Sequence, residues 1–233
     1  MTDPRPPLNR SDALEDEVVA LRADNARLRR LLDEEGMPDS LRHAFRDTVA
    51  MLRVIMRRTA DSAVDVQGYN GHLTGRLDAI VKARLLTDAF GEAGLRTLVA
   101  EALNVYLVRD GEQAALEGPD VRLRPKAAEV FALAMHELAT NAVAHGVLGG
   151  GGGVTVSWRV DPGEDAPTLE LMWKETGAIG LAAPGRSGFG TVVLEEMLAY
   201  DLRAQARLSY ELDGLRCRIQ LPLTPRSGRV VVD

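Results

Sequence analysis

The chain has 233 residues, of which 45% are hydrophobic and 27% charged, and its formal net charge is −6. This length fits one or two compact units, and this composition excludes a wholly disordered chain. The excess of acidic residues argues against a protein that binds nucleic acid through a broad basic surface. The single cysteine, Cys217, excludes an intramolecular disulfide and a zinc site built from cysteines. No apolar run reaches about eighteen residues and residues 1–10 do not resemble a signal peptide, so we expect a cytoplasmic protein without membrane insertion.

The sequence of residues 1–37 predicts a disordered N-terminal segment followed by a coiled coil. From Leu14 to Leu32, leucine, valine and asparagine recur at alternating spacings of four and three residues, which is the seam of a heptad repeat. A buried Asn25 in this seam favours a parallel two-stranded coil, and therefore a homodimer. The alternative is an amphipathic helix that lies on its own domain.

Residues 38–91 predict an antiparallel helical hairpin. We expect a first helix from about Pro38 to Val66, a break at Gly68 to Gly71, and a second helix from Leu73 to Phe90. A hairpin of this size buries little core by itself, so we expect two copies to pair into a four-helix bundle. The side chains expected to be buried on the first helix are Leu41, Phe45, Thr48, Leu52, Ile55 and Thr59.

Residues 92–223 predict an α+β domain in which helices pack on a mostly antiparallel sheet. The expected helices cover residues 95–106, 127–145 and 188–202. The expected strands include residues 121–123, 154–158, 169–173, 206–212 and 215–221. A glycine run at 149–153 predicts a flexible loop, and we expect the tail, 224–233, to be loose.

The long helix of this domain contains a polar pair, Glu137 and Asn141. The two are four residues apart, so their side chains leave the same face of the helix. A carboxylate and a carboxamide placed in this way can position a water molecule and a Mg²⁺ ion, which prefers oxygen ligands and binds triphosphate oxygens. A capping or solvent-facing polar pair is the structural alternative.

Two further motifs have the residue types of a nucleotide site. Glu175 lies at a predicted strand end, where its carboxylate can accept a hydrogen bond from a purine amine, and Gly177 would let the ring come close. Gly188 and Gly190 open a predicted helix, where backbone N–H groups can bind phosphates, and Arg186 adds a fixed positive charge. The order of the motifs, on a helix, a strand end and a loop into a helix, makes chance a poor explanation.

With these motifs the sequence resembles the HWE histidine kinases, a family within the GHKL ATPase superfamily. The three letters of the family name correspond to His136, Trp173 and Glu175. The asparagine box of the family is similar to H-E-L-A-T-N-A-V-A-H-G, its second glycine box to G-F-G-T-V-V-L-E, and its last strand to L-R-C-R-I-Q-L-P-L. The likeness covers roughly residues 39 to 223.

The resemblance implies a GHKL-type α/β sandwich that uses ATP and Mg²⁺. It implies that Asn141 holds Mg²⁺, that Glu137 assists phosphoryl transfer and that Glu175 contacts adenine. The ATP-binding residues that it implies are Asn141, Glu175, Gly177, Arg186, Gly188, Phe189, Gly190 and Thr191.

The phosphoacceptor motif of the family is similar to H-A-F-R-D, which begins at His43. His43 lies about 200° around the helix from Leu41 and Phe45, so we expect an exposed imidazole, as in-line attack on a γ-phosphate requires. The resemblance therefore implies a protein-histidine kinase that phosphorylates itself on His43. The phosphoryl group would then pass to an aspartate in the receiver domain of a response regulator.

Four positions depart from the family pattern: Asp47 replaces an asparagine, Ala44 a basic residue, Ala144 a lysine, and Ala178 follows Gly177 where a second glycine is usual. We expect these changes to weaken ATP use more than the fold. The residues expected to modulate the reaction are Asp47, Arg46, His136 and Trp173.

Two other functions therefore stay open. One is a histidine phosphotransferase with a degenerate ATP-binding domain, and the other is a GHKL ATPase or Ser/Thr kinase of the anti-sigma type. Since few residues precede the hairpin, we expect the input signal to arrive through the coiled coil or from an upstream sensory protein.

Overall fold

The structure is a computed structural model that describes residues 19, 22–24, 26–27, 39–106, 108, 113–144, 147–149, 151–163, 166–177 and 188–231. The seam residues of the predicted coiled coil, Asn25 included, lie outside the described residues. The chain divides into two compact units, Met1–Val54 and Ile55–Asp233.

Helix α2 (Asp39–Ser62) begins directly after Pro38, as predicted, and runs from the first unit into the second. Its expected buried side chains divide along its length. Ile55 and Thr59 are buried, whereas Leu41 is 52% exposed in the single chain. The pairing of two such hairpins into a four-helix bundle stays a prediction.

Helix α3 (Val66–Leu85) begins earlier than predicted. Asp65 has an extended backbone and accepts a hydrogen bond from the backbone N–H of Gly68 at 2.7 Å, which is the geometry of an N-cap. The predicted break at Gly68 to Gly71 is therefore wrong, because the capping aspartate starts the helix before the glycines. Both glycines lie inside α3.

A five-stranded sheet with the order β2-β4-β5-β7-β6 forms the second unit's main layer. Its strands are β2 (Ala114–Glu117), β4 (Gly153–Asp161), β5 (Thr168–Thr176), β6 (Gln205–Glu211) and β7 (Gly214–Pro222). Only the β2–β4 pair is parallel; β4, β5, β7 and β6 pair antiparallel along most of their length. A smaller sheet pairs β1 (Ala93–Gly94), β3 (Val121–Leu123) and β8 (Gly228–Val230).

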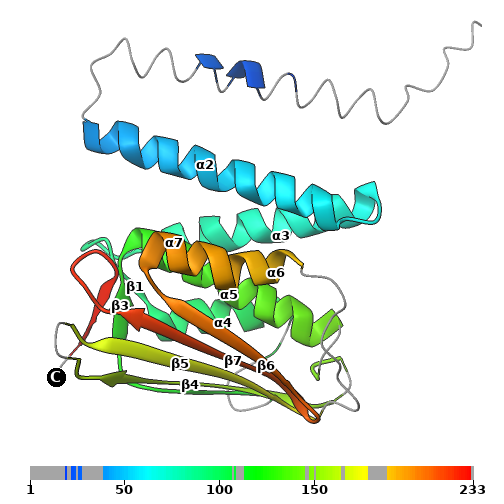
Figure 1. Cartoon of the computed structure of the whole chain (residues 1–233), viewed down its shortest axis with the longest axis vertical. Coiled ribbons are helices and arrows are strands. Elements are labelled where there is room, and N and C mark those ends of the chain that lie inside the picture. Colours follow the sequence, from blue (N-terminus) through cyan, green and yellow to red (C-terminus); the bar gives the residue numbers. More distant parts are fainter. Residues whose placement is uncertain are drawn as a thin grey trace, which may run out of the picture. The chain divides into compact units, whose positions relative to one another are not determined.

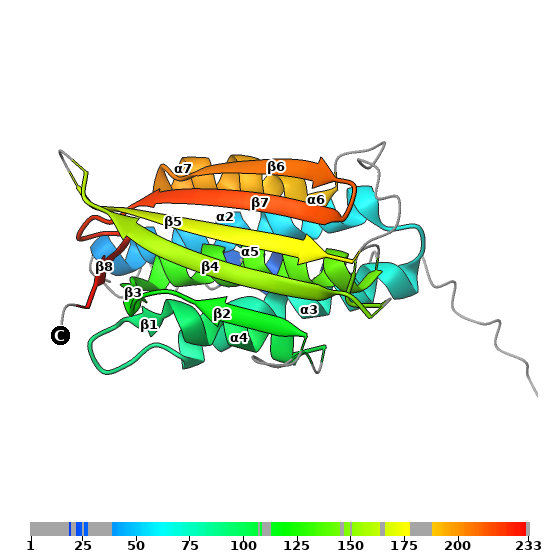
Figure 2. The same cartoon turned by 90° about the horizontal axis from the view of Figure 1, so that it is seen from below.

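Helices cover one face of the five-stranded sheet (Figure 2). They are α4 (Leu95–Asn104), α5 (Pro125–Ala144), α6 (Phe189–Thr191) and α7 (Leu198–Leu202), with a π-helical segment, η1 (Val192–Met197), between the last two. Leu169, Leu171 and Trp173 alternate along β5 and are fully buried on this face. The predicted α+β domain is confirmed.

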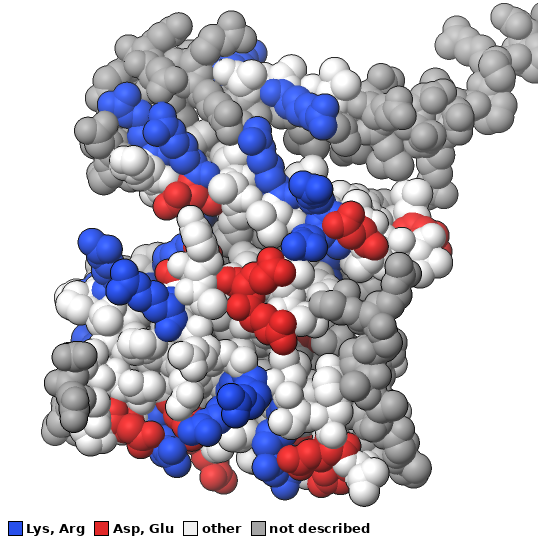
Figure 3. Space-filling view, in the orientation of Figure 1, with Lys and Arg blue, Asp and Glu red and all other residues white. Residues whose placement is uncertain are grey.

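Helix α3 forms a further layer, because it packs along α5 on the side away from the sheet (Figure 1). The second hairpin helix is thus joined to the α+β domain across the predicted boundary at residue 91. Among the described residues, no helix is long and apolar enough to cross a membrane. On the face of the second unit shown in Figure 3, acidic and basic side chains are interspersed.

The tail after Pro225 was expected to be loose, but part of it forms a strand. Strand β8 pairs antiparallel with β3, with Arg229 opposite Arg122. The guanidinium of Arg229 also donates hydrogen bonds of 2.9 to 3.2 Å to the buried carboxylate of Glu92. This ion pair fixes a three-residue strand whose short apolar pattern gave no signal in the sequence.

Candidate functional site

Helix α5 carries the polar pair that the sequence singled out. It begins at Pro125, a residue well suited to a first helical turn, and it lies between the sheet and α3, so that most of its side chains are buried. Glu137 is buried, whereas Asn141, one turn later, is exposed. One face of α5 thus carries both a buried carboxylate, that of Glu137, and an accessible amide, that of Asn141.

The start of α6 lies directly against this pair. A Cβ atom placed on Gly190 would lie 3.4 Å from Nδ2 of Asn141 and 3.5 Å from Cβ of Glu137. The structure therefore brings together the asparagine motif and the glycine segment, which are far apart in the sequence. Gly188 stands at the N-cap of α6 with an extended backbone, Phe189 is buried and Thr191 is half-buried. Arg186 lies outside the described residues.

A buried arginine that the sequence analysis did not single out completes this side of the site. Arg76 of α3 donates from Nε to Oε1 of Glu137 at 2.9 Å and from Nη2 to Oε2 at 3.1 Å. Its guanidinium carbon also lies 3.9 Å from the centroid of the Phe189 ring. The signal was available in the sequence, because Arg76 takes a place in the stripe of Leu73, Ile80 and Ala83, at spacings where an apolar residue is expected.

The end of β5 holds Glu175 in a different set of contacts. The indole Nε1 of Trp173 donates a hydrogen bond to Oε1 of Glu175 at 3.3 Å, and the backbone N–H of Leu215 donates to the same carboxylate. Glu175 is only 2% exposed, and burial raises its pKa above the ordinary value. Among the described residues, no hydrogen bond joins Glu175 to Glu137 or Asn141.

Gly177 follows with a φ of 98°, a backbone conformation that favours glycine. A Cβ atom at Gly177 would lie 3.0 Å from Cα of Gly152, and one at Gly152 would lie 2.4 Å from the carbonyl oxygen of Thr176. The glycine run and the end of β5 therefore touch through their backbones. Close packing of the backbone is therefore sufficient to require glycine at both positions, whether or not a ligand approaches them.

Asn141 is the residue of this site that was predicted to hold a metal ion. Among the described residues, no group of three or more His, Cys, Asp or Glu side chains is placed to hold a metal ion. Mg²⁺ bound with phosphates needs only one or two protein ligands, because water and phosphate oxygens complete its coordination. Asn141 is exposed, and its side-chain amide, which lies beside Gly190 with its nitrogen nearest, carries an oxygen of the kind that this requirement needs.

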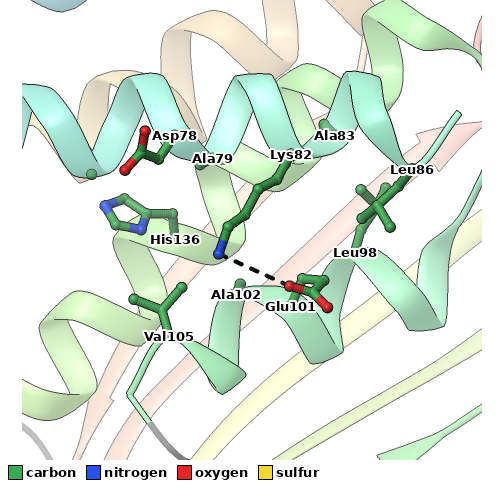
Figure 4. A pocket seen from close by; sticks show the side chains of 12 residues that line it. Asp78, Ala79, Lys82, Ala83, Leu86, Leu98, Glu101, Ala102, Val105 and His136 are labelled. Atoms are coloured by element: carbon green, nitrogen blue, oxygen red, sulfur yellow. Dashed lines mark ion pairs between the residues drawn. The ribbon is translucent and has the colours of Figure 1, made fainter.

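His136 lies on the side of α5 that faces α3. It is 8% exposed, and burial lowers the pKa of its imidazole below the ordinary value. It lines one end of a pocket of about 100 Å³ between α3, α4 and α5 (Figure 4). Between His136 and the opposite end of the pocket, where Figure 4 shows Leu86 and Leu98, Nζ of Lys82 and Oε2 of Glu101 lie 4.0 Å apart.

The predicted phosphoacceptor, His43, and two of the residues predicted to modulate it, Arg46 and Asp47, belong to the first unit. His43, Arg46 and Asp47 are all exposed on α2. The exposed imidazole agrees with the helical periodicity, and Asp47 lies one turn beyond it on the same helix.

Comparisons with known proteins agree with the predicted family. The family model described as HWE histidine kinase matches residues 40–120. A blue-light-activated histidine kinase of Brucella anthropi is 28% identical over 195 residues, which are 82% of this chain and 40% of the relative. One of Brucella abortus (strain 2308) is 27% identical over 186 residues, which are 78% of this chain and 38% of the relative. The chain thus spans about two fifths of the length of these relatives.

One solved structure has the same fold over most of its length. The histidine kinase domain of a blue-light-activated histidine kinase from Erythrobacter litoralis is 18% identical, with a TM-score of 0.52, over 77% of this chain and 85% of that chain. This match supports the fold, while the family model and the relatives agree with the resemblance that the motifs predicted.

Proposed function

Since the chain resembles the HWE histidine kinases, we propose that it is an ATP-dependent protein-histidine kinase with His43 as its phosphoacceptor. The observation that carries the proposal is the close approach of Gly190 to Asn141 and Glu137, which a Cβ atom placed on Gly190 would meet at 3.4 and 3.5 Å. It places a helix N-terminus, an exposed amide and a carboxylate together, and these are the groups that a triphosphate and its transfer require.

The nucleotide would bind where the glycine segment meets α5. Backbone N–H groups at Gly188 and Gly190 would donate to phosphate oxygens, and Arg186 would add positive charge. Glu175 would accept a hydrogen bond from the adenine amine, with Trp173 fixing the orientation of its carboxylate. Thr191 lies in the first turn of the same helix.

Asn141 would hold a Mg²⁺ ion through its amide oxygen. When bound, the ion supplies positive charge that neutralises the phosphate oxygens during transfer. The accessible amide of Asn141 on helix α5 supports this role, since a helical residue would hold the ion without the cost of ordering a loop.

The reaction would form a phosphorus–nitrogen bond on His43. The imidazole nitrogen attacks the γ-phosphorus, the bond to the β,γ-bridging oxygen breaks, and ADP leaves with the electron pair of that bond. The proton lost by the imidazole would pass to a carboxylate, a role for which Glu137 is proposed. The phosphoryl group would then move to an aspartate of a response regulator receiver domain, and the chain would act as a homodimer.

Incubation with γ-labelled ATP and Mg²⁺ tests the proposal. The unmutated chain should acquire an acid-labile label, and His43→Ala should abolish it. Asn141→Ala should abolish Mg²⁺-dependent ATP binding in calorimetry without a large change in thermal unfolding, because this side chain is exposed.

The pattern of failure separates the alternatives. An unmutated chain that binds neither ATP nor ADP, but accepts phosphate on His43 from a phosphorylated receiver domain, would be a histidine phosphotransferase. A chain that consumes ATP and labels a serine or threonine of another protein would be a kinase of the anti-sigma type.

A further inference from the structure

We infer that Arg76 is a positioning residue for the kinase reaction, because it fixes the carboxylate of Glu137 and the ring of Phe189 from the second hairpin helix. This inference rests on the proposed function and assigns to α3 a part in the nucleotide site. All of the residues involved belong to the second unit.

Three different contacts hold the Arg76 guanidinium. Nε and Nη2 donate to the two oxygens of Glu137 at 2.9 and 3.1 Å, and Nη1 donates to Oγ1 of Thr59 at 2.7 Å. The Phe189 ring covers the guanidinium at 3.9 Å from its centroid. The guanidinium therefore has one orientation, which matches the planar fork of a carboxylate.

Thr59 makes this arrangement rigid. Its hydroxyl donates to the backbone carbonyl of Ile55 at 2.6 Å while it accepts from Arg76, and the residue is fully buried. The hydroxyl thus has a donor and an acceptor role that are both satisfied. Arg76 is thus held on one side by α2, through its hydrogen bond to Thr59.

The consequence for the site is geometric. Glu137 has its Oε2 atom 3.7 Å from the Cβ position of Gly190, and Phe189 is the residue between the two glycines of the α6 segment. Arg76 therefore contacts one residue from each of the two motifs that form the phosphate side of the site. A displacement of about 1 Å in such a group can lower a reaction rate by about a hundredfold.

The chain offers a control ion pair on the same two helices, in which the arginine side chain is 50% exposed, against 5% for Arg76. Nε of Arg84 on α3 donates to Oε1 of Glu129 on α5 at 2.6 Å. This pair joins the same helices, with Arg84 about two turns from Arg76 along α3 and Glu129 about two turns from Glu137 along α5. We expect loss of either arginine to weaken the contact between the helices, and loss of Arg76 to change the site as well.

The test compares three variants of the full chain: Arg76→Gln, Arg76→Lys and Arg84→Gln. The labelling rate is measured at saturating ATP, and the affinity for ATP is measured by calorimetry. We expect Arg76→Gln to lower the maximal rate about 10- to 100-fold while the dissociation constant of ATP changes less than about threefold, because Glu137 acts on transfer. Lysine should not restore the rate, since an ammonium cannot pair with both oxygens in the plane. Arg84→Gln should keep the rate of the unmutated chain.

A double-mutant cycle shows whether Arg76 acts through Glu137. In a Glu137→Gln background, Arg76→Gln should cause no further loss of rate, and this neutral pair also keeps the test valid if Arg76→Gln alone does not fold. An equal effect of Arg76→Gln and Arg84→Gln, additive losses in the cycle, or a faster reaction after Arg76→Gln would overturn the inference. If the unmutated chain binds ATP but no residue is labelled, the proposed function fails, and the inference fails with it.

Discussion

Gly75 of α3 and His136 of α5 set the approach of the two helices. A Cβ atom placed on Gly75 would lie 2.9 Å from Nε2 and 3.0 Å from Cε1 of His136, closer than atoms of packed side chains come. The imidazole is buried at the end of the pocket between α3, α4 and α5. The absence of a side chain at Gly75 is therefore what allows His136 to face α3.

Gly75→Ala should show this constraint when it is compared with Gly71→Ala in the same helix. At Gly71 a new Cβ atom would meet nothing within 4 Å, so alanine should raise the free energy of unfolding by about 0.5–1 kcal/mol. At Gly75 the same gain in the free energy of unfolding is opposed by a cost of about 1–3 kcal/mol, because the new Cβ atom would overpack against His136. Urea denaturation measures both, and equal gains at the two positions would contradict the close contact.

Local signals in the sequence were sufficient for most of the second unit. Leu169, Leu171 and Trp173 alternate with polar residues and form the buried face of β5, as their period predicted. Glu137 and Asn141 were placed on one helix face by spacing alone. Such predictions succeed because helix and strand periods are properties of short segments.

Contacts between distant segments were not predictable in the same way. The partner of Arg76 is Glu137 of another helix, and the partner of Arg229 is Glu92, far earlier in the chain. Each pairing depends on how whole elements pack, which no local period specifies. Asp65 shows a different limit, because a capping side chain outweighed the glycines that follow it.

Glu175→Gln should make stability less dependent on pH. The raised pKa of Glu175, caused by burial, means that the folded chain favours the protonated form. The stabilising contribution of this group is therefore complete below its ordinary value of 4.5 and is lost as pH rises through the folded-state pKa. A permanently neutral glutamine should raise the melting temperature at pH 7.5 more than at pH 4.

The exposed Glu195→Gln serves as the control for Glu175→Gln and should change neither melting temperature appreciably. Destabilisation by Glu175→Gln at pH 7.5 would show that the carboxylate is stabilised there by its hydrogen bonds from Trp173 and Leu215. Under the proposed function, the same variant should also weaken ATP binding, which calorimetry measures separately.

Arg229→Ala should loosen the small sheet. It removes the hydrogen bonds that join β8 to the buried carboxylate of Glu92, whose remaining ion-pair partner among the described residues is Arg124, at 3.4 Å. Amide hydrogen exchange in β8 and in the adjacent β3 should become faster, while exchange in β5 should be unchanged. Arg226→Ala, an exposed change in the preceding turn, is the control; equal exchange in both variants would mean that the ion pair does not hold β8.

Asp47→Asn should raise the rate at which the chain removes phosphate from a receiver domain. Asp47 is exposed one turn after His43, and its carboxylate can only accept hydrogen bonds, whereas an asparagine amide can donate one to a hydrolytic water. A receiver domain that accepts label from the unmutated chain is purified in its phosphorylated form, and release of inorganic phosphate is followed with each variant. Asp61→Asn, at an exposed position near the other end of α2, should release phosphate at the unmutated rate. An unchanged or slower release of phosphate with Asp47→Asn would show that the side chain at position 47 does not control hydrolysis of the receiver phosphate.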